Sequence, residues 1–138
     1  MEYIVNLTRK ETFAASHRLH SNELTDKENK KLFGKCNHIH GHGHNYGLEV
    51  TVRGNVDKKT GIVINLVDLK DIINDVVMSK VDHKHLNFDV EEFKILNPTT
   101  ENLAIVIWNW LDEAIGDGLL YEVIIHETDK NSVSINRQ

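Results

Sequence analysis

Four of the nine histidines stand at every second position of one short stretch, GKCNHIHGHGHNYG, residues 34–47. They are His38, His40, His42 and His44. Residues i and i+2 of a strand point to the same side, so two such imidazoles can hold one metal ion. Glycine between them leaves room on the opposite face. The sequence His-Gly-His before Tyr46 therefore predicts a two-ligand metal site at the start of a strand.

A third ligand is available in FAASHRLH, where His17 ends the first expected strand. If the two strands pair, His17 lies beside His42 and His44. Three histidines with one open position are typical of catalytic zinc, whereas structural zinc sites usually fill all four positions. A solvated loop or a fortuitous surface site is the alternative, but the density of histidines favours a metal site. We interpret His20 and His85 as surface residues.

The single cysteine, Cys36, shares this stretch. A buried inert thiol is the ordinary interpretation of any cysteine, and a thiolate can also bind zinc. Lys35 beside it favours the thiolate, which makes Cys36 a candidate general base. In VDHKHLN, Asp82 can orient His83, and this pair can tune a thiol. Alone, an Asp-His pair is more often a helix-end arrangement of charges.

Other polar residues can line a pocket. Glu127, in HETD, is either an exposed strand carboxylate or an acceptor of two parallel hydrogen bonds from a guanine or pterin edge. Thr99, Thr100 and Glu101 first indicate the start of a helix. Their hydroxyls and backbone N–H groups can also face a ligand.

The expected strands follow from alternating residues, and the segments between them from turn chemistry. Residues 18–35 have little pattern and are interpreted as a long functional loop. The turn at residues 57–61 predicts a hairpin with GIVINL as its return strand. The expected strands are residues 3–16, 46–53, 61–66, 120–128 and 132–137, and the last two form a closing hairpin.

Two segments have helical periodicity. Residues 66–80 carry one apolar stripe. A second helix begins within NPTTEN, residues 97–102, with a threonine cap, and ends at Gly116 and Gly118. Its expected buried stripe is Leu103, Val106, Ile107, Trp110, Leu111 and Ala114. The order of elements predicts an α+β domain over residues 1–138, with an antiparallel sheet covered on one face by two helices.

The composition of the chain disfavours several classes of partner and location. The formal charge of -5 disfavours a nucleic-acid partner, and an anionic substrate needs a locally positive pocket. One cysteine forms no intrachain disulfide, which fits a reducing compartment. The sequence shows no signal peptide and no apolar run long enough for a membrane span. We expect a soluble, cytoplasmic protein without a membrane or nucleic-acid partner.

Seven motifs together resemble the 6-pyruvoyl-tetrahydropterin synthase family. They are FAASHRL, LFGKCN, GHGHNY, TGIVINLVDLK, VDHKHLN, PTTEN and HETD. They occur in family order and span nearly the whole chain. The resemblance implies the tunnelling fold, a four-stranded antiparallel sheet with two helices on one face. It further implies that three sheets form a β-barrel, that two trimers stack as a homohexamer, and that active sites lie between subunits.

The resemblance also implies roles for individual residues. The zinc ligands would be His17, His42 and His44. The catalytic group would be Cys36, Asp82 and His83. Glu127 would anchor the pterin, with Thr99, Thr100 and Glu101 nearby. The reaction implied is conversion of 7,8-dihydroneopterin triphosphate to 6-pyruvoyl-tetrahydropterin with loss of inorganic triphosphate, a lyase step in tetrahydrobiopterin synthesis. One Zn²⁺ per subunit and a Mg²⁺ with the triphosphate are the implied metals, and Lys35 and Arg18 are candidate triphosphate ligands.

The motifs are also compatible with other functions. The pyruvoyl-forming enzymes have Cys-x5-His-Gly-His, met by Cys36, His42 and His44. The related 6-carboxy-tetrahydropterin synthases of the queuosine pathway have Cys-x3-His-Gly-His, which His40 and His42 also meet. We favour His42 and His44 because they run directly into the strand NYGLEVTV, with His40 as the fallback ligand. An aldolase-like activity on dihydroneopterin, a zinc hydrolase and a non-enzymatic metal-binding module are further alternatives.

Overall fold

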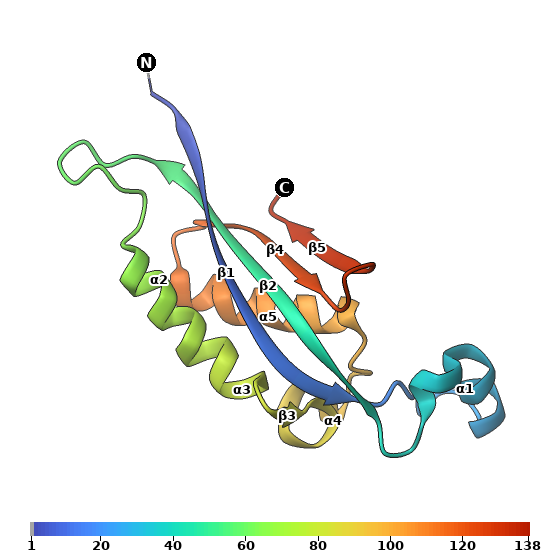
Figure 1. Cartoon of the computed structure of the whole chain (residues 1–138). Helices are drawn as coiled ribbons and strands as arrows, with labels where there is room; N and C mark the ends of the chain where they lie inside the picture. Colours follow the sequence, from blue (N-terminus) through green and yellow to red (C-terminus); the bar gives the residue numbers. More distant parts are fainter. Residues whose placement is uncertain (1) are drawn as a thin grey trace.

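One mixed sheet of five strands organises the chain, in the order β3-β1-β2-β4-β5 (Figure 1). The computed structural model describes residues 2–138. The strands are β1 (Ile4–His17), β2 (His42–Asn55), β3 (Lys84–His85), β4 (Leu120–His126) and β5 (Ser132–Asn136). The four longer strands are antiparallel, as expected, and the two-residue β3 adds a parallel partner to β1.

The long pair formed by β1 and β2 sets the position of the site. Its register runs without interruption from Ile4 opposite Asn55 to His17 opposite His42. Along β2 the side chains of Tyr46, Leu48 and Val50 are fully buried, whereas those between them are not. Because side chains alternate across a strand, this pattern fixes which face of β2 meets the core.

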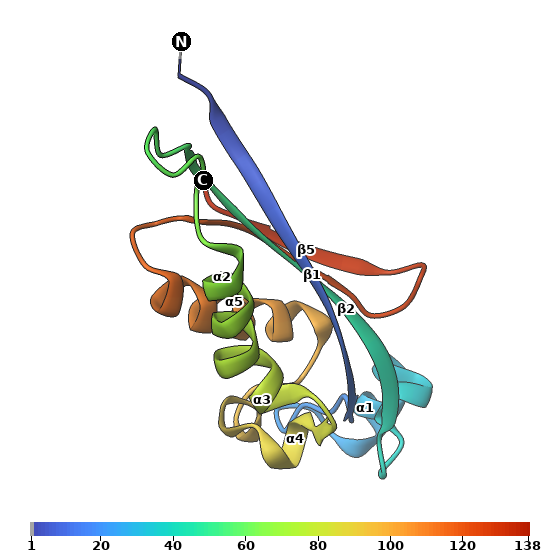
Figure 2. The same ribbon diagram turned by 60° about the vertical axis from the view of Figure 1, so that its left-hand side comes forward.

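Helices cover one face of the sheet, as Figure 2 shows. The expected helix over residues 66–80 is present as α2 (Leu66–Ile73), the π-helical turn η2 (Asn74–Met78) and α3 (Ser79–Val81). The second is α5 (Thr100–Ile115). The fully buried core side chains of the helices are Leu69, Ile73, Val77, Val81, Leu103, Ala104, Ile107 and Leu111. In the expected stripe of α5, Trp110 is only half-buried and Ala114 is exposed.

The ends of α5 agree with the sequence. The Thr99 side chain accepts a hydrogen bond from the Asn102 backbone N–H, which is an N-cap. Gly116 ends the helix with φ of 74°, a conformation that favours glycine.

The predicted return strand at residues 61–66 is wrong. Residues 56–65 form a turn and loop, and Asn65 caps α2 by accepting a hydrogen bond from the Val67 backbone N–H. The physical reason lies in the sheet, where β1 and β4 already occupy both edges of β2. A hairpin partner would have no free edge to join.

The predicted long loop at residues 18–35 is also wrong in part. It contains α1 (Asp26–Phe33), followed by the 3-10 turn η1 (Gly34–Asn37). A capping box between Thr25 and Glu28 starts the helix. The hydrophobic pattern gave no sign of α1 because Asn29 is its one buried residue. Two short helical turns, α4 (Leu86–Asp89) and η3 (Glu91–Lys94), precede α5.

Within residues 2–138, no helix has both the length and the apolar character that crossing a membrane requires.

Candidate metal centre and active site

Strand pairing brings three histidines together at one end of the sheet. His17, the last residue of β1, lies opposite His42, the first residue of β2. His44 is two residues further along β2 and therefore on the same face as His42. One ring nitrogen from each of the three histidines lies within 4.8 Å of the other two. The expected ligand set is thus a spatial cluster.

The rings of the cluster meet edge to face around a small space. The His17 Nε2 atom lies 3.2 Å from the His42 Nε2 atom. The centroid of the His44 ring is 4.8 Å from that of His42 and 5.3 Å from that of His17. Three imidazole nitrogens this close suit one ion with an open coordination position.

A backbone carbonyl sets the tautomer of His17. Its Nδ1 atom lies 2.7 Å from the Pro98 carbonyl oxygen, which can only accept, so Nδ1 donates. The Nε2 lone pair then points toward His42. Such a partner on the distal nitrogen is typical of metal-binding histidines.

Unpartnered nitrogens support the fit to a metal. Within residues 2–138, the His44 Nε2 atom is buried and has no hydrogen-bond partner, and the same holds for His42 Nδ1. Buried polar atoms are normally hydrogen-bonded, so an orphaned nitrogen in a histidine cluster needs an explanation. A metal ion bound by the cluster supplies one for the His44 Nε2 atom.

Burial favours the neutral form of His17 and His42. It lowers the pKa of His17 from its usual 6.5 to about 4. Burial, and then repulsion from His44, lowers the pKa of His42. Neutral imidazole is the form that binds metal. His17 and His42 are therefore ready to bind an ion at neutral pH.

The lowered pKa of His17 predicts how the metal-free protein responds to acid. Between pH 6.5 and about 4 the unfolded chain protonates this residue, whereas the folded chain does not. The free energy of unfolding should therefore fall as the pH falls, by about 1.4 kcal/mol per pH unit. Urea unfolding of chelator-treated protein at several pH values measures this slope. Constant stability between about pH 6.5 and 5 would contradict the burial of a neutral His17.

A carboxylate lies next to the histidine cluster. Glu127 follows β4, and its Oε1 atom is 4.0 Å from the His44 Nε2 atom. The hydroxyl of Thr100, the first residue of α5, donates to the Glu127 Oε2 atom. The Glu127 side chain is 25% exposed, so it remains open to a ligand. Burial and, second, the nearby Glu127 carboxylate raise the pKa of Tyr46 above its usual value.

The remaining residues of the α5 start differ in their environment. Thr99 uses its side-chain oxygen as the helix cap. Glu101 is exposed in the first turn of α5. Of these three residues, only Thr100 forms a hydrogen bond with Glu127.

Asp82 and His83 form a pair against the backbone of β1. The Asp82 Oδ1 atom accepts a hydrogen bond of 3.0 Å from the Ala14 N–H, and the His83 Nδ1 atom lies 3.0 Å from the same oxygen. The Ala14 N–H is the main cause that lowers the pKa of Asp82. The His83 N–H donates in turn to the Ala14 carbonyl, with His83 at φ of 61°.

The His83 imidazole is 83% exposed and opens on a groove of about 570 Å³. His44 lines the same groove, together with Ser16, Gly43 and Asn45. His83 thus lines the same groove as His44 of the histidine cluster.

Cys36 is not part of the histidine cluster within the described chain. It lies half-buried in η1, where its carbonyl accepts a hydrogen bond from the Leu19 N–H. The three expected histidine ligands lie in one cluster that does not include this thiol. One chain by itself does not place the thiol among the histidines.

Other histidines lie outside the cluster. His38 and His40 are both exposed, and the His40 N–H donates to the His38 Nδ1 atom. His20 and His85 are half-buried, so our interpretation of them as surface residues is wrong. His20 contacts the Asn37 side chain, and His85 lies against Gly41, whose φ of 77° is a turn conformation that suits glycine.

A model of the 6-pyruvoyl tetrahydropterin synthase family matches residues 6–138. The chain belongs to this family. A 6-pyruvoyl tetrahydrobiopterin synthase of Drosophila melanogaster is 55% identical over 129 residues, 93% of this chain and 77% of the fly protein. The human protein of the same name is 50% identical over 127 residues, 92% of this chain and 88% of its own.

The fold agrees with this membership. The structure of Caenorhabditis elegans 6-pyruvoyl tetrahydropterin synthase superposes with a TM-score of 0.94 at 44% identity, covering 99% of this chain and 97% of that chain. The family resemblance of the seven motifs is thereby confirmed.

The positions of the histidines distinguish the two motif spacings that the sequence of this 6-pyruvoyl tetrahydropterin synthase family member allows, Cys-x5-His-Gly-His and Cys-x3-His-Gly-His. The histidine pair that joins His17 is His42 and His44, whereas His40 stays outside. The pair therefore follows Cys36 at the Cys-x5-His-Gly-His spacing, not at the Cys-x3 spacing.

Two contacts of the site could not be predicted from residue types in the sequence. The Pro98 carbonyl orients His17, and the Ala14 backbone holds Asp82 and His83. Both partners act through main-chain atoms, which any residue carries.

Proposed function

We propose that this enzyme converts 7,8-dihydroneopterin triphosphate to 6-pyruvoyl-tetrahydropterin and inorganic triphosphate, a lyase step in tetrahydrobiopterin synthesis. One observation carries the proposal most strongly. In a chain of this family, His17, His42 and His44 form a three-nitrogen cluster with Glu127 only 4.0 Å from His44. A metal ligand set and a carboxylate for the pterin edge thus stand side by side.

We infer that the ion is zinc, held by His17, His42 and His44. Three imidazoles with one open coordination position are typical of catalytic zinc. When bound, zinc supplies Lewis acidity that makes C–H protons beside coordinated hydroxyl groups easier to remove. Glu127, held by Thr100, would accept two hydrogen bonds from the amino-imino edge of the pterin. This contact would orient the substrate side chain toward the histidine cluster.

The proton transfers fall to Cys36, Asp82 and His83. The Cys36 thiolate would accept a proton from a side-chain carbon of the substrate. Triphosphate would leave with the electrons of its C–O bond, and electrons from the side chain would pass into the ring. The ring is reduced while the side chain is oxidised, so the reaction needs no external reductant. Asp82 and His83 would return protons and set the state of the thiol.

Cys36 and the histidine cluster are separate in one chain, which favours a site shared between subunits. We propose the homohexamer of the family, built from trimers whose sheets join into a barrel. The sheet supports this assembly because β3 pairs with β1 only at Ala15 and Ser16. Most of the outer edge of β1 therefore has no strand beside it within the described chain. The rest of this edge presents unpaired backbone N–H and C=O groups, which are a template for pairing with another chain. We further propose Mg²⁺ with the triphosphate and, from the single cysteine, a reducing cytoplasmic location.

Release of inorganic triphosphate tests the reaction class. Zinc-loaded protein given 7,8-dihydroneopterin triphosphate should release one triphosphate for each pterin consumed. Release of single phosphates, or of none, would overturn the proposed elimination.

Glu127→Gln should weaken substrate binding while the metal stays bound. The amide keeps the shape of the side chain but loses the charge and one acceptor for the pterin edge. Hydrogen bonds to a charged group contribute about 1.5–3 kcal/mol, so KM should rise about 10- to 100-fold. Kinetics and metal analysis measure the two effects. Glu113→Gln, an exposed position on α5, is the matched control and should behave as the unmodified enzyme.

A normal KM in Glu127→Gln would contradict the anchoring role. It would also favour a non-enzymatic metal-binding module, in which Glu127 has no task.

A further inference from the structure

A second, larger groove opens beside the histidine cluster. Its volume is about 1230 Å³, and His42 lines it at one side. Arg18, Lys30 and Lys35 also line it, whereas Asp26 is its single carboxylate. The chain as a whole carries a net charge of -5. The groove is therefore a local exception, a positive recess on an acidic protein.

The groove is formed by α1 and η1, which lie beyond the end of the sheet (Figure 1). We call residues 18–37 the arm. Two buried asparagines brace it. The Asn29 side-chain amide donates to the carbonyls of Ser21, Leu24 and Thr25, and its oxygen accepts from the Ser21 N–H. Asn29 is fully buried, and every one of these bonds ties the helix to the segment before it.

The second asparagine fixes the base of the arm. Asn37 is 5% exposed, and its side-chain amide donates to the Leu19 carbonyl. The Arg18 Nε atom donates to the Asn37 carbonyl, so the guanidinium group is held at the groove. Buried polar groups with their bonds satisfied hold a backbone in one arrangement. The cations are thus positioned before a ligand arrives, which lowers the cost of binding.

We propose that this groove binds the triphosphate of the substrate and, after the reaction, the released inorganic triphosphate. Arg18, Lys30 and Lys35 are its cationic partners. The identity of the polyanion rests on the proposed function. The position supports it, because His42 belongs to both the groove and the histidine cluster. A substrate whose hydroxylated side chain lies at the cluster has its triphosphate next to this recess, and the free product competes with it.

Two variants that change the charge of the groove in opposite directions test this proposal. In Lys30→Gln/Lys35→Gln, calorimetry without magnesium should show about tenfold weaker binding of inorganic triphosphate, the factor that about 1.4 kcal/mol of lost binding free energy produces. Asp26→Asn should bind it tighter, because the one opposing charge is gone. Added salt should weaken binding in the unmodified protein more than in the double variant.

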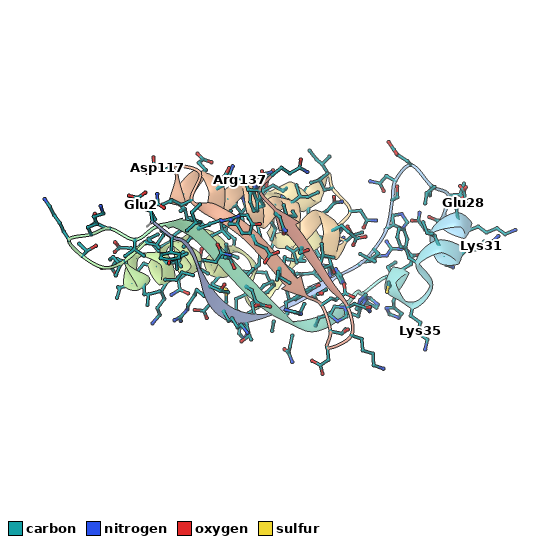
Figure 3. All side chains as sticks on the ribbon, turned by 90° about the horizontal axis from the view of Figure 1, so that it is seen from above. Glu2, Glu28, Lys31, Lys35, Asp117 and Arg137 are labelled. Atoms are coloured by element: carbon teal, nitrogen blue, oxygen red, sulfur yellow. The ribbon has the colours of Figure 1, made fainter. Side chains whose placement is uncertain are left out.

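Lys31→Gln is the matched control. Figure 3 shows Lys31 on α1 pointing away from the rest of the molecule, and Lys35 on a different side. Lys31 is exposed on the same helix as Lys30, so its loss changes the net charge without touching the groove. The affinity of Lys31→Gln for inorganic triphosphate should stay within about twofold of the unmodified protein. The double variant, by contrast, should lose about tenfold, which corresponds to about 1.4 kcal/mol.

Turnover separates the two proposals. In an active enzyme the double variant should raise KM about tenfold. Lys30→Gln alone leaves Lys35 in place beside Cys36, so it should raise KM less and keep kcat nearly unchanged. Inorganic triphosphate should inhibit the unmodified enzyme competitively and the double variant weakly. If the unmodified enzyme turns over and the double variant keeps both its KM and its triphosphate affinity, the groove proposal is overturned. If the protein binds triphosphate in the groove without consuming the pterin, the proposed function fails and the groove stands.

Discussion

His42→Ala is expected to abolish both metal binding and turnover. The side chain contributes one of three nitrogens that lie within 4.8 Å of one another, and two imidazoles remain after the change. Loss of a group that only orients a metal ligand costs about 10- to 100-fold in affinity, so loss of a ligand should exceed about 100-fold. Metal analysis after dialysis and a turnover assay with saturating zinc measure both effects.

His40→Ala is the matched control for this prediction. It removes a histidine from the same alternating run, two residues away, but His40 is exposed and outside the cluster. The variant should keep its metal and its activity. If His40→Ala loses the metal and His42→Ala retains it, the ligand register is the Cys-x3 one and our assignment is wrong.

Cys36→Ala is expected to stop turnover and leave the metal in place. The thiol lies in η1, outside the histidine cluster, so its removal takes no ligand away. A positioned general base contributes about 100- to 10,000-fold to a rate, and turnover should fall by this factor. Stopped assays with long incubation measure the residual rate, and metal analysis is run on the same sample.

Cys36→Ser separates chemistry from packing in this experiment. Serine fills nearly the same space, but its hydroxyl does not ionise near neutral pH, so turnover should fall as far as with alanine. Loss of the metal in both variants would make Cys36 a ligand and would overturn the division between a histidine cluster and a catalytic thiol.

Periodicity explains how much of the fold was predictable. The alternation in β2 and the helical stripe of residues 66–80 record burial against one core, and the structure confirms both. The apolar residues of GIVINL suit a strand as well as they suit the observed loop. A strand also needs a free sheet edge, and whether β2 has one depends on how the other strands of the chain pair. α1 buries almost nothing, so only its capping box between Thr25 and Glu28 could have indicated it.

The part of the site that could be predicted from the sequence is the part formed by side chains at a fixed spacing on paired strands. His42 and His44 share a face because they alternate on a strand, and His17 joins them because β1 pairs with β2 in one register. The orientation of His17 depends on the Pro98 carbonyl, and the Asp82–His83 pair depends on the Ala14 backbone. Such main-chain contacts arise only from the folded path of the chain.

The identity of the pterin product tests the central claim most directly. Zinc-loaded, assembled protein would be incubated with 7,8-dihydroneopterin triphosphate in the absence of any reductase, and the pterin identified by mass spectrometry. We expect 6-pyruvoyl-tetrahydropterin. A 6-carboxy-tetrahydropterin product, or unchanged substrate from protein with full metal content, would contradict it.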